Sequence, residues 1–573
     1  MPNTNVSIFN DVMGPIMRGP SSSHTAAANR IGRILRPFCM SLTANNHASS
    51  ESTENEILVM VKYDPAGSLA TTAGPQGSNI GLAAGILGFD CKDERLKDSE
   101  TLLELSGISF TTEIGIIGEN DHPNTYHITI KNPKTGGSHW MIALSTGGGA
   151  IHIQSVDGVN IDSKGDRHMC LLYVSHSSAA LLSQKLAAKQ ISCRKWINVC
   201  HRHERVRYSK EEQEANEKIQ MILIESLGPI DIESISDDIA VLCAAVIMIP
   251  CVMPVPRPED INLPFTTCSE MQSWMGNNHC VIGEWLPFEL ACQYESARSG
   301  LKTTEIVEKM AEIVDIYDES IKTGLRGTTF EDRILGAQSV IYKQNLEKNG
   351  TLYDLGLIDS VILYTSAFME MKSSFGLIVA GPTAGSCGTV PGCIIAAGKK
   401  LGKDRTDMAR ALLVCGLVGV FIATKSTFAA EEGGCQAECG AAGAMAAAGL
   451  VALKGGDTRQ CFVASSLTLQ SLLGMVCDPI GNRVEAPCLM RNVCAASMAC
   501  SSANMAMSNY TAVIPFDEVI AAHWEICKAM PRSLRCTGLG GLAAQPSARK
   551  IEEELLKGRG CSSCSCSTPF NTY

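Results

Sequence analysis

The sequence predicts a multidomain protein with an α/β N-terminal domain, a small α+β middle module and an all-α C-terminal domain. Short β-branched runs alternate with helical patterns over residues 1–160, whereas residues 265–558 are almost entirely helical in pattern and rich in Ala, Leu, Met and Gly. Residues 165–250 form a separate alternation of strands and helices, and the proline-rich segment 251–264 reads as a linker. At 573 residues the chain is too long for one hydrophobic core, so several domains are expected.

The composition excludes several classes of function. Charged residues make up 19% of the chain and the net charge is −11, which gives no electrostatic basis for binding nucleic acid or an anionic membrane. The N-terminus lacks the pattern of a secretion signal, and apolar stretches such as 240–255 and 411–424 are shorter than the ~20 residues of a membrane span. We therefore expect a cytoplasmic protein whose 25 cysteines are mostly free thiols, with a few metal ligands.

In the N-terminal domain, a run of serines precedes the first helix. Residues Ser21–Thr25 read SSSHT, and residues 26–38 follow with a helical period. A serine at this position caps a helix, and the free backbone N–H groups there suit an anion such as a substrate carboxylate. Plain capping without a ligand is the structural alternative. Further along, a strand is predicted at Glu56–Tyr63 and a helix at Ile80–Leu87.

The middle module has a β-α-β-β-α-β order, which is the ferredoxin-like arrangement. Its strands are predicted at 168–175, 192–204, 218–225 and 241–249, and its helices at 177–190 and 232–239. The order resembles that of the small-molecule-sensing ACT module. The same fold also serves as a passive dimerisation unit, so an effector site remains one of two interpretations, and a homodimer is expected.

In the helical domain, three cysteines lie at turn positions. Cys435, Cys477 and Cys488 each stand beside Gly, Pro, Asp or Glu. Thiolates are soft ligands that suit iron–sulfur clusters and zinc, and three of them leave one iron of a four-iron cube free for a substrate. Ordinary buried thiols are the alternative, because the intervals of 42 and 11 residues match no compact zinc pattern.

Polar residues near these cysteines complete the candidate set. Thr383 and Ser386 stand where Pro and Gly break a helix, and we expect them to face the metal site. A charge in such an apolar context is rarely left unpaired. Arg491 could therefore grip a carboxylate with two nitrogens, and Glu438 could orient a ligand or pair with Arg491.

The sequence motifs around these residues resemble those of a known family. GPTAGSCGTVPG, GGCQAECG, VCDPIG and APCLMRN are similar to the α portion of the iron–sulfur-dependent L-serine dehydratases (L-serine ammonia-lyases), and MGPIMRGPSSSHTAAANRIGRI resembles their β portion. His122-Pro123-Asn124 and the run STGGGA at Ser145–Ala150 also match the β portion. These motifs occur in family order over nearly the whole chain, as if both portions were fused.

The resemblance implies an enzyme that deaminates L-serine to pyruvate and ammonia. In that family a [4Fe–4S] cluster acts as a Lewis acid in β-elimination of water, without pyridoxal phosphate. Residue by residue, its ligands fall on Cys435, Cys477 and Cys488. The expected substrate-binding residues are polar groups from both portions, namely Ser21, Ser22, Thr383, Ser386 and Arg491. The expected acid–base residues are His24, Ser23 and Thr25. The partners implied are a small amino-acid substrate and an effector at the ACT-like module.

Two positions depart from the family's pattern. Typical members carry Gly-His-Gly-Thr-Asp where this chain has Gln76 at the His position and Asn79 at the Asp position. An amide cannot accept a proton near neutral pH, so that role is lost or is held elsewhere, for instance by His24. The same elimination on threonine, cysteine or a larger β-hydroxy amino acid is therefore an alternative activity.

The last segment, residues 559–573, is short and rich in cysteine. It carries Cys561, Cys564 and Cys566 and the chain's only CxxC spacing. A redox pair, a cap on an open iron as the family resemblance implies, and plain surface thiols are the possible roles. Together with the ACT-like module, this tail also admits a non-catalytic iron or redox sensor as a third hypothesis.

Overall fold

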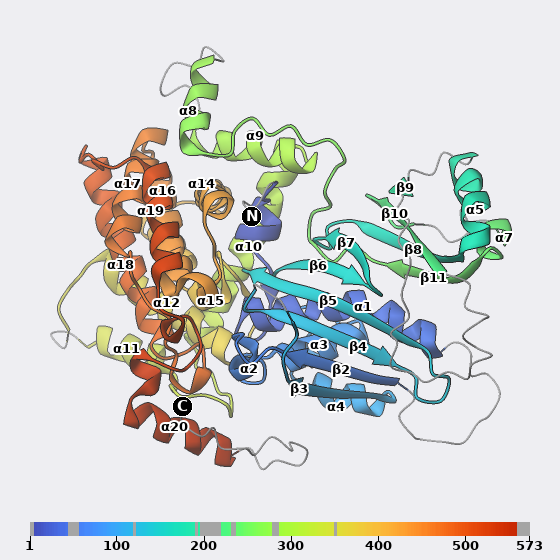
Figure 1. The fold of residues 1–573 in the computed structure, drawn as a ribbon. Coiled ribbons are helices and arrows are strands. Elements are labelled where there is room, and N and C mark those ends of the chain that lie inside the picture. The colour runs from blue at the N-terminus through green and yellow to red at the C-terminus, as the bar shows by residue number, and fades with distance from the viewer. Residues whose placement is uncertain are drawn as a thin grey trace.

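Two larger β-sheets, of six and four strands, lie beside a large group of helices (Figure 1). The structure is a computed structural model, and it describes residues 5–43, 57–118, 122–188, 193–194, 219–230, 237–277, 286–348 and 352–558. A mixed sheet dominates the N-terminal region and helices dominate the C-terminal region, as the sequence predicts. The Cys-rich tail at 559–573 lies outside the described residues.

The N-terminal region is built on a six-stranded sheet in the order β3-β2-β4-β5-β6-β7. The strands are β2 (Ile57–Tyr63), β3 (Ile108–Ile114), β4 (Thr125–Lys131), β5 (Ser138–Gly147), β6 (Ala150–Val156) and β7 (Val159–Ser163). Only the β2–β3 pair among these is parallel. Alternate residues of β2 are buried, so the hydrophobic period of two specifies the strand predicted there.

Two helices cover one face of this sheet. They are α1 (Ala27–Thr43) and α3 (Ser78–Leu87), both within two residues of their predicted starts, and the short α2 (Leu69–Thr72) and α4 (Ser99–Leu105) flank them (Figure 1). A Cβ atom on Gly85 would collide with the backbone of Asn29. The two helices can therefore cross closely because glycine occupies the contact.

A four-stranded antiparallel sheet forms the middle region, in the order β11-β8-β10-β9. Its elements are β8 (His168–Ser175), α5 (His176–Ala188), β9 (Cys193–Arg194), β10 (Ile219–Ser226), α7 (Asp237–Ala240) and β11 (Cys243–Ile249). Leu171 packs into the N-terminal core, whereas Leu172 packs with residues of α5. Much of the strand predicted at 192–204 and of the helix predicted at 232–239 lies outside the described residues, and the ACT-like assignment stays a prediction.

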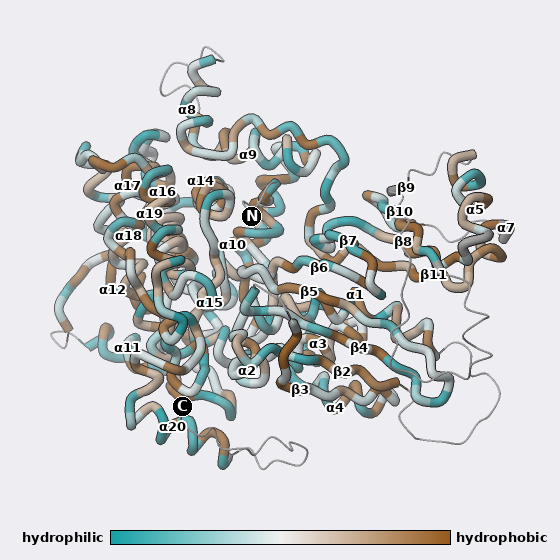
Figure 2. The backbone as a smooth tube through the Cα atoms, viewed as in Figure 1, coloured by the Kyte–Doolittle hydropathy of each residue, from teal (hydrophilic) through white to brown (hydrophobic). Residues whose placement is uncertain are grey.

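Helices fill the C-terminal region. They are α8 (Cys268–Asn277), α9 (Pro287–Ser299), α10 (Thr303–Gly324), α11 (Gln338–Leu346), α12 (Leu357–Ser373), α13 (Thr389–Leu401), α14 (Arg405–Lys425), α15 (Ala430–Gly433), α16 (Ala441–Lys454), α17 (Thr458–Ser471), α18 (Cys488–Met507), α19 (Phe516–Ala529) and α20 (Pro546–Gly558). Hydrophobic residues recur along these helices and along both sheets (Figure 2). Two helical stretches, 405–425 and 436–454, are long and apolar enough to cross a membrane, but 83% and 89% of their apolar windows are buried inside the fold, as in core helices.

The first residues of the chain pack into the helical region. Val6, Phe9 and Met13 belong to the same buried cluster as the C-terminal helices, and β1 (Ile16–Met17) pairs with β12 (Ile378–Val379). The N-terminal sheet is thereby held against the helices by a segment that precedes it in sequence. The predicted domain boundaries remain predictions.

Candidate functional site

Three buried thiols gather where the helical region faces the N-terminal region. Cys435 precedes a π-helical turn (Gln436–Gly440), Cys477 lies in an extended segment, and Cys488 begins α18. Ligand atoms of Cys435, Cys477 and Glu438 all lie within 4.8 Å of one another. The Cys488 thiol contacts that of Cys435. The structure therefore brings together the three predicted ligands.

Contact among the thiols shifts their protonation. The pKa of Cys435 lies well below its usual value, because the thiols of Cys477 and Cys488 and the nearby Arg491 guanidinium stabilise its thiolate. The pKa values of Cys477 and Cys488 lie well above the usual value, first because of their contact with Cys435 and then because of burial. Closely spaced thiols, one of which has a lowered pKa, are a suitable donor set for a soft metal.

The segment before Cys488 is fixed by buried charges. The carboxylate of Glu485 accepts hydrogen bonds from Arg333 Nε (2.9 Å) and from the backbone N–H of Ile334 (2.7 Å). The wholly buried Lys372 donates to the carbonyl oxygen of Val484. Each charged group is thus paired by hydrogen bonds, which is what burial requires.

Arg491 faces the thiols rather than open space. Its Nη2 donates to Asp478 Oδ1 at 2.6 Å, and its Nη1 lies 3.6 Å from Cys435 Sγ. Asp478 in turn accepts from the backbone N–H of Leu542 at 2.6 Å. Two of the guanidinium nitrogens that the sequence assigns to a substrate carboxylate are therefore engaged by protein groups, and Arg491 pairs with Asp478 instead of Glu438.

Thr383 lies beside Glu438 and Ser386 lies next to Thr383; that both face a metal site stays a prediction. The hydroxyl of Thr383 donates to Glu438 Oε1 at 2.7 Å and lies 3.1 Å from the hydroxyl of Ser386. The pKa of Glu438 is raised well above its usual value by burial and by the charge of Cys435. A Cβ on Gly385 would meet the Glu438 carboxyl, so the glycine makes room for it.

On the opposite side, the serine run forms one turn of π-helix (Ser22–Ala26) that holds His24. Ser21 caps the turn by accepting from the His24 backbone N–H at 3.3 Å, as predicted. The imidazole is wholly buried: its Nδ1 lies 3.0 Å from Ser23 Oγ and 3.1 Å from Ser21 Oγ, and its Nε2 lies 2.6 Å from Thr72 Oγ1. Burial lowers the pKa of His24, and the charge of Glu431 partly offsets this shift.

Glu431 contacts the serine run and the imidazole from the segment that carries Cys435. Its Oε1 accepts from Ser23 Oγ at 2.8 Å and lies 3.6 Å from His24 Nδ1. Its Oε2 is buried and has no hydrogen-bond partner within the part of the chain that the structure describes. Because Glu431 lies on α15, four positions before Cys435, one short segment carries both an acid–base partner and a predicted metal ligand.

Two other members of the serine run make structural contacts, Ser22 to the helical region and Thr25 within the N-terminal region. Ser22 Oγ accepts from the backbone N–H of Ala384 at 3.0 Å, and Thr25 Oγ1 donates to the Gln76 carbonyl oxygen at 2.8 Å. Ser23 and His24 are thus the predicted residues of this run that meet Glu431.

Sequence reasoning missed three residues of the site. Glu431, Thr72 and Cys536 come from separate segments, and Cys536 packs with Cys435 and Cys477 in one buried cluster. Glu431 had a weak signal, since it is an acidic residue beside a predicted ligand. Cys536 had none, because it is one of 25 cysteines and lies outside the recognised motifs.

Buried polar atoms without partners mark the motifs that match the β portion. Both side-chain atoms of Asn124 and the hydroxyl of Ser145 are buried and unpartnered within the described part of the chain. The backbone N–H of Ser145 donates to the carbonyl oxygen of Asn124 at 3.0 Å, so the two lie together. His122, two positions before Asn124, lies close enough to Glu431 and Glu432 for their charges to raise its pKa, although burial lowers it overall. Such unsatisfied groups indicate space for a polar ligand.

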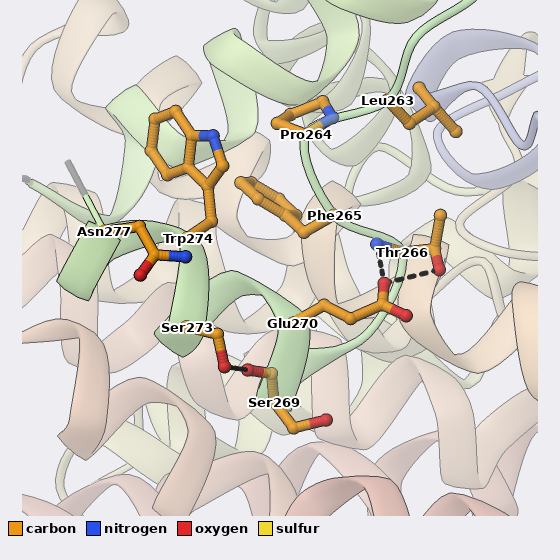
Figure 3. A pocket seen from close by; sticks show the side chains of 9 residues that line it. All are labelled: Leu263, Pro264, Phe265, Thr266, Ser269, Glu270, Ser273, Trp274 and Asn277. Carbon is orange, nitrogen blue, oxygen red and sulfur yellow. Dashed lines mark hydrogen bonds between the residues drawn. The ribbon is translucent and has the colours of Figure 1, made fainter.

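A separate surface hollow of about 470 Å³ lies at the end of the linker and along α8 (Figure 3). It is lined by Leu263, Pro264, Phe265, Thr266, Ser269, Glu270, Ser273, Trp274 and Asn277. Glu270 accepts from the Thr266 backbone N–H at 2.7 Å and from its hydroxyl at 2.8 Å. Its carboxylate is therefore satisfied locally, and the hollow contains none of the site residues described above.

Comparison with known proteins identifies one family model and several relatives. A family model described as "Serine dehydratase alpha chain" matches residues 205–543. The probable L-serine dehydratase alpha chain of Bacillus subtilis (strain 168) is 38% identical over 258 residues, which cover 45% of this chain and 86% of the relative. The L-serine dehydratase alpha chain of Peptoniphilus asaccharolyticus is 36% identical over 272 residues, covering 47% and 92%. L-serine dehydratase TdcG of Escherichia coli (strain K12) is 35% identical over 192 residues, covering 33% and 42%.

Proposed function

Because the chain belongs to the L-serine dehydratase family, whose members are lyases, we propose that it eliminates water from L-serine and releases ammonia and pyruvate. We further propose that the reaction depends on a [4Fe–4S] cluster held by Cys435, Cys477 and Cys488. The observation that carries the proposal is the juxtaposition of these thiols with the Ser23–His24–Glu431 group across the boundary between the two regions.

The donor set fits this cofactor. Three buried sulfur atoms meet in one place, the pKa of Cys435 is lowered by the other two thiols, and the Arg491 guanidinium next to Cys435 offsets negative charge. A cluster bound there would supply a Lewis-acidic iron to assist departure of the β-hydroxyl group. Glu438 lines the same space and can donate a hydrogen bond to a bound substrate, since its raised pKa favours the protonated form, and the Thr383 hydroxyl donates to Glu438 and orients it.

His24 is the base that we propose for the α-proton. The Thr72 hydroxyl donates to the Ser68 carbonyl oxygen at 2.8 Å, so the 2.6 Å contact with His24 assigns the ring proton to Nε2. Nδ1 is then the acceptor nitrogen, and it faces Ser21, Ser23 and Glu431. The lowered pKa keeps the ring neutral near pH 7, and Glu431 stabilises the imidazolium that forms when Nδ1 takes a proton.

The substrate is expected to lie between the two groups. The unpartnered Glu431 Oε2 and the amide of Asn124 are hydrogen-bonding groups left over for a substrate ammonium and hydroxyl group. Ser21 and Ser22 shape the turn that holds His24, and their hydroxyls are engaged by protein groups.

The test is an anaerobic preparation in which iron and sulfide are counted and ammonia and 2-oxo acid release are measured for serine, threonine, cysteine and larger β-hydroxy amino acids. We expect about four irons per chain and fastest turnover of serine. Iron without turnover of any amino acid would contradict the enzyme and favour a sensor. Protein that turns over serine without iron would contradict the cluster.

A second substrate is favoured by one contact. Gln76, which stands where family members carry His, donates to Cys536 Sγ at 3.4 Å at the edge of the site. An altered polar group there is consistent with elimination from another β-substituted amino acid. Threonine or cysteine turning over faster than serine would establish this alternative.

We also propose that the four-stranded middle region is an ACT-like module with a small-molecule effector, that the enzyme is a homodimer and that it is cytoplasmic. The antiparallel order β11-β8-β10-β9 supports the first of these. Size-exclusion chromatography with light scattering tests the dimer, and an amino-acid panel added to the serine assay tests the effector.

A further inference from the structure

A buried lysine, Lys372, lies next to the segment that leads to Cys488. It is the second-last residue of α12, a helix that packs against α18, and none of its surface is exposed. Its ammonium group donates a hydrogen bond to the carbonyl oxygen of Val484, four positions before Cys488. Lysine is almost never fully buried unless it is paired, so this position needs a physical explanation.

The hydrogen bond to Val484 does not balance the charge of Lys372. An ammonium group has three N–H donors, and this carbonyl oxygen accepts from one of them. No carboxylate in the described ranges of the chain forms an ion pair with Lys372. Glu485, next in sequence to Val484, pairs instead with Arg333 at 2.9 Å. A buried cation without a counter-charge costs free energy, so a negative charge is missing from this place.

The charge of Lys372 acts on groups of the thiol site. Contact with Cys435 and then burial raise the pKa of Cys488, and burial raises the pKa of Glu438; in both groups the positive charge of Lys372 acts in the opposite direction. Glu438 is a poor counter-ion, because its raised pKa favours the neutral acid. The negative charge that would balance Lys372 is therefore not supplied by these side chains.

A second cation of the site is already balanced. Arg491 Nη1 lies 3.6 Å from Cys435 Sγ, but Arg491 Nη2 donates to Asp478 Oδ1 at 2.6 Å, so this pair adds no net charge. Lys372 adds an unbalanced positive charge on the side of Cys488. A four-iron cluster bound by three thiolates is an anion, and reduction by one electron makes it more negative. The cluster thus has the sign of charge that Lys372 lacks.

We propose that Lys372 is the counter-charge of the iron–sulfur cluster and that it makes reduction of the cluster more favourable. The inference rests on the proposed function, because the anion is the cluster assigned to Cys435, Cys477 and Cys488. In a low-dielectric interior, a positive charge stabilises the reduced, more negative state more than the oxidised state. Lys372 acts on the cluster through its charge and is not a catalytic residue.

The reduction potential of the cluster tests the proposal. Wild type, Lys372→Met, Lys372→Gln and Lys372→Arg are prepared anaerobically, and each cluster is titrated with a reductant and followed by EPR. Lys372→Met removes the charge and keeps a long side chain, so reduction should become about tenfold less favourable, a potential lower by about 59 mV for a one-electron couple. Lys372→Gln keeps a hydrogen-bond donor without the charge and should resemble Lys372→Met. Lys372→Arg keeps the charge and should stay near wild type.

The stability of the cluster-free protein gives an independent readout. Without the cluster, Lys372 is a buried cation that lacks its counter-charge, so Lys372→Met should raise the urea midpoint of chelator-treated protein. With the cluster bound the order should reverse, and Lys372→Met should lose iron in air faster than wild type. A side chain with only a packing role would lower the midpoint in both forms when replaced, and that result would overturn the proposal.

Lys400→Met is the matched control. Lys400 is an exposed lysine near the end of α13, and its replacement should change neither the potential nor the midpoint, because solvent screens its charge. A wild-type potential in both Lys372→Met and Lys372→Gln overturns this inference alone, since the cluster and serine turnover would remain. Wild-type protein that contains no iron and sulfide overturns the proposed function, and this inference with it.

Discussion

The N-terminal region meets the helices at two buried polar places that differ in how fully their groups are satisfied. In the first, which we call the anchor junction (Ser7, Ile8, Glu295 and Arg298), both oxygens of Glu295 accept hydrogen bonds, from Ser7 Oγ at 2.9 Å and from Ile8 N–H at 2.8 Å. The guanidinium of Arg298 donates to the carbonyl oxygens of Asn5 and Pro256. Its charge also lies 3.6 Å from Asp166.

The second place, the thiol–imidazole site (Cys435, Cys477, Cys488, His24 and Glu431), is left incomplete. Glu431 Oε2 has no partner among the described residues, and the thiols crowd together where no disulfide joins them. Burial of unsatisfied groups costs free energy, so it persists where a ligand restores the missing contacts. The comparison teaches that satisfied buried charge holds the halves together, whereas unsatisfied buried charge marks the place for chemistry.

The largest expected effect follows from removing a sulfur of the site. Cys477→Ser should lower serine turnover by at least roughly 10³-fold, because Lewis-acid assistance is worth several kcal/mol of transition-state stabilisation. Iron content, measured on the same anaerobic preparation, should fall with it. Cys494→Ala is the matched control on an exposed thiol. Full turnover by Cys477→Ser would show that the thiols of the thiol–imidazole site are not needed for catalysis.

The next effect separates the base from the metal site. His24→Asn should lower kcat by about 10²–10⁴-fold while iron and sulfide content stay at the wild-type level, since a general base contributes this much and the thiols are untouched. Glu431→Gln keeps the hydrogen bond from Ser23 but loses the charge, and should have a smaller effect. Loss of iron in His24→Asn would indicate a structural role instead.

The anchor junction should respond in stability and leave chemistry intact. Glu295→Ala deprives two buried donors of their acceptor and should lower the free energy of unfolding by roughly 3 kcal/mol, measured by urea denaturation. Turnover per bound cluster should remain near that of wild type. Glu289→Ala on the same helix, which removes the acceptor for Leu286 N–H, is a control with an expected cost of about 1 kcal/mol. A large drop in kcat with unchanged stability would mean that the anchor junction serves catalysis and not stability.

Local elements of the fold could be predicted from the sequence, because their signals are local. The strand at 168–175 has its predicted bounds, and β2 and α3 begin within two residues of the predicted starts. The pairing of β1 with β12 could not be foreseen, since it joins two-residue strands more than 350 positions apart whose partners leave no periodic signal.

The candidate site also combines features that the sequence predicts with contacts that it does not. The family resemblance predicts Cys435, Cys477 and Cys488 as one ligand set, and in the structure Cys477 and Cys488 both lie against Cys435. The capping role of Ser21 follows from its position before a helix. The contact of Ser23 with Glu431 spans 408 positions and that of Gln76 with Cys536 spans 460, so only the folded chain reveals them. The pairing of Arg491 with Asp478 could not be foreseen either, because before folding Asp478 cannot be distinguished from any other acidic neighbour, and the substrate role of Arg491 stays a prediction.

The smallest expected effect is a pH dependence of stability that differs between the anchor junction and the thiol–imidazole site. Burial raises the pKa of Glu295 to about 7, whereas burial lowers that of His24. Between the unfolded-state pKa near 4.5 and pH 7 the folded chain retains a proton on Glu295 that the unfolded chain releases. This contribution is therefore fully present below pH 4.5 and is lost as the pH rises, with a loss of about 2 kcal/mol between pH 5 and pH 7.

Denaturation of wild type and Glu295→Gln across this pH range isolates the contribution, because Gln cannot titrate and all other groups are shared. The stability of wild type relative to the variant should fall as the pH rises. The neutral His24 has the opposite dependence, since its contribution to both folding and turnover is present above the ordinary histidine pKa and is lost as the pH falls through the lowered value. A difference curve that is flat for Glu295→Gln would mean that this carboxylate is already ionised, and that the anchor junction is a buried ion pair with Arg298.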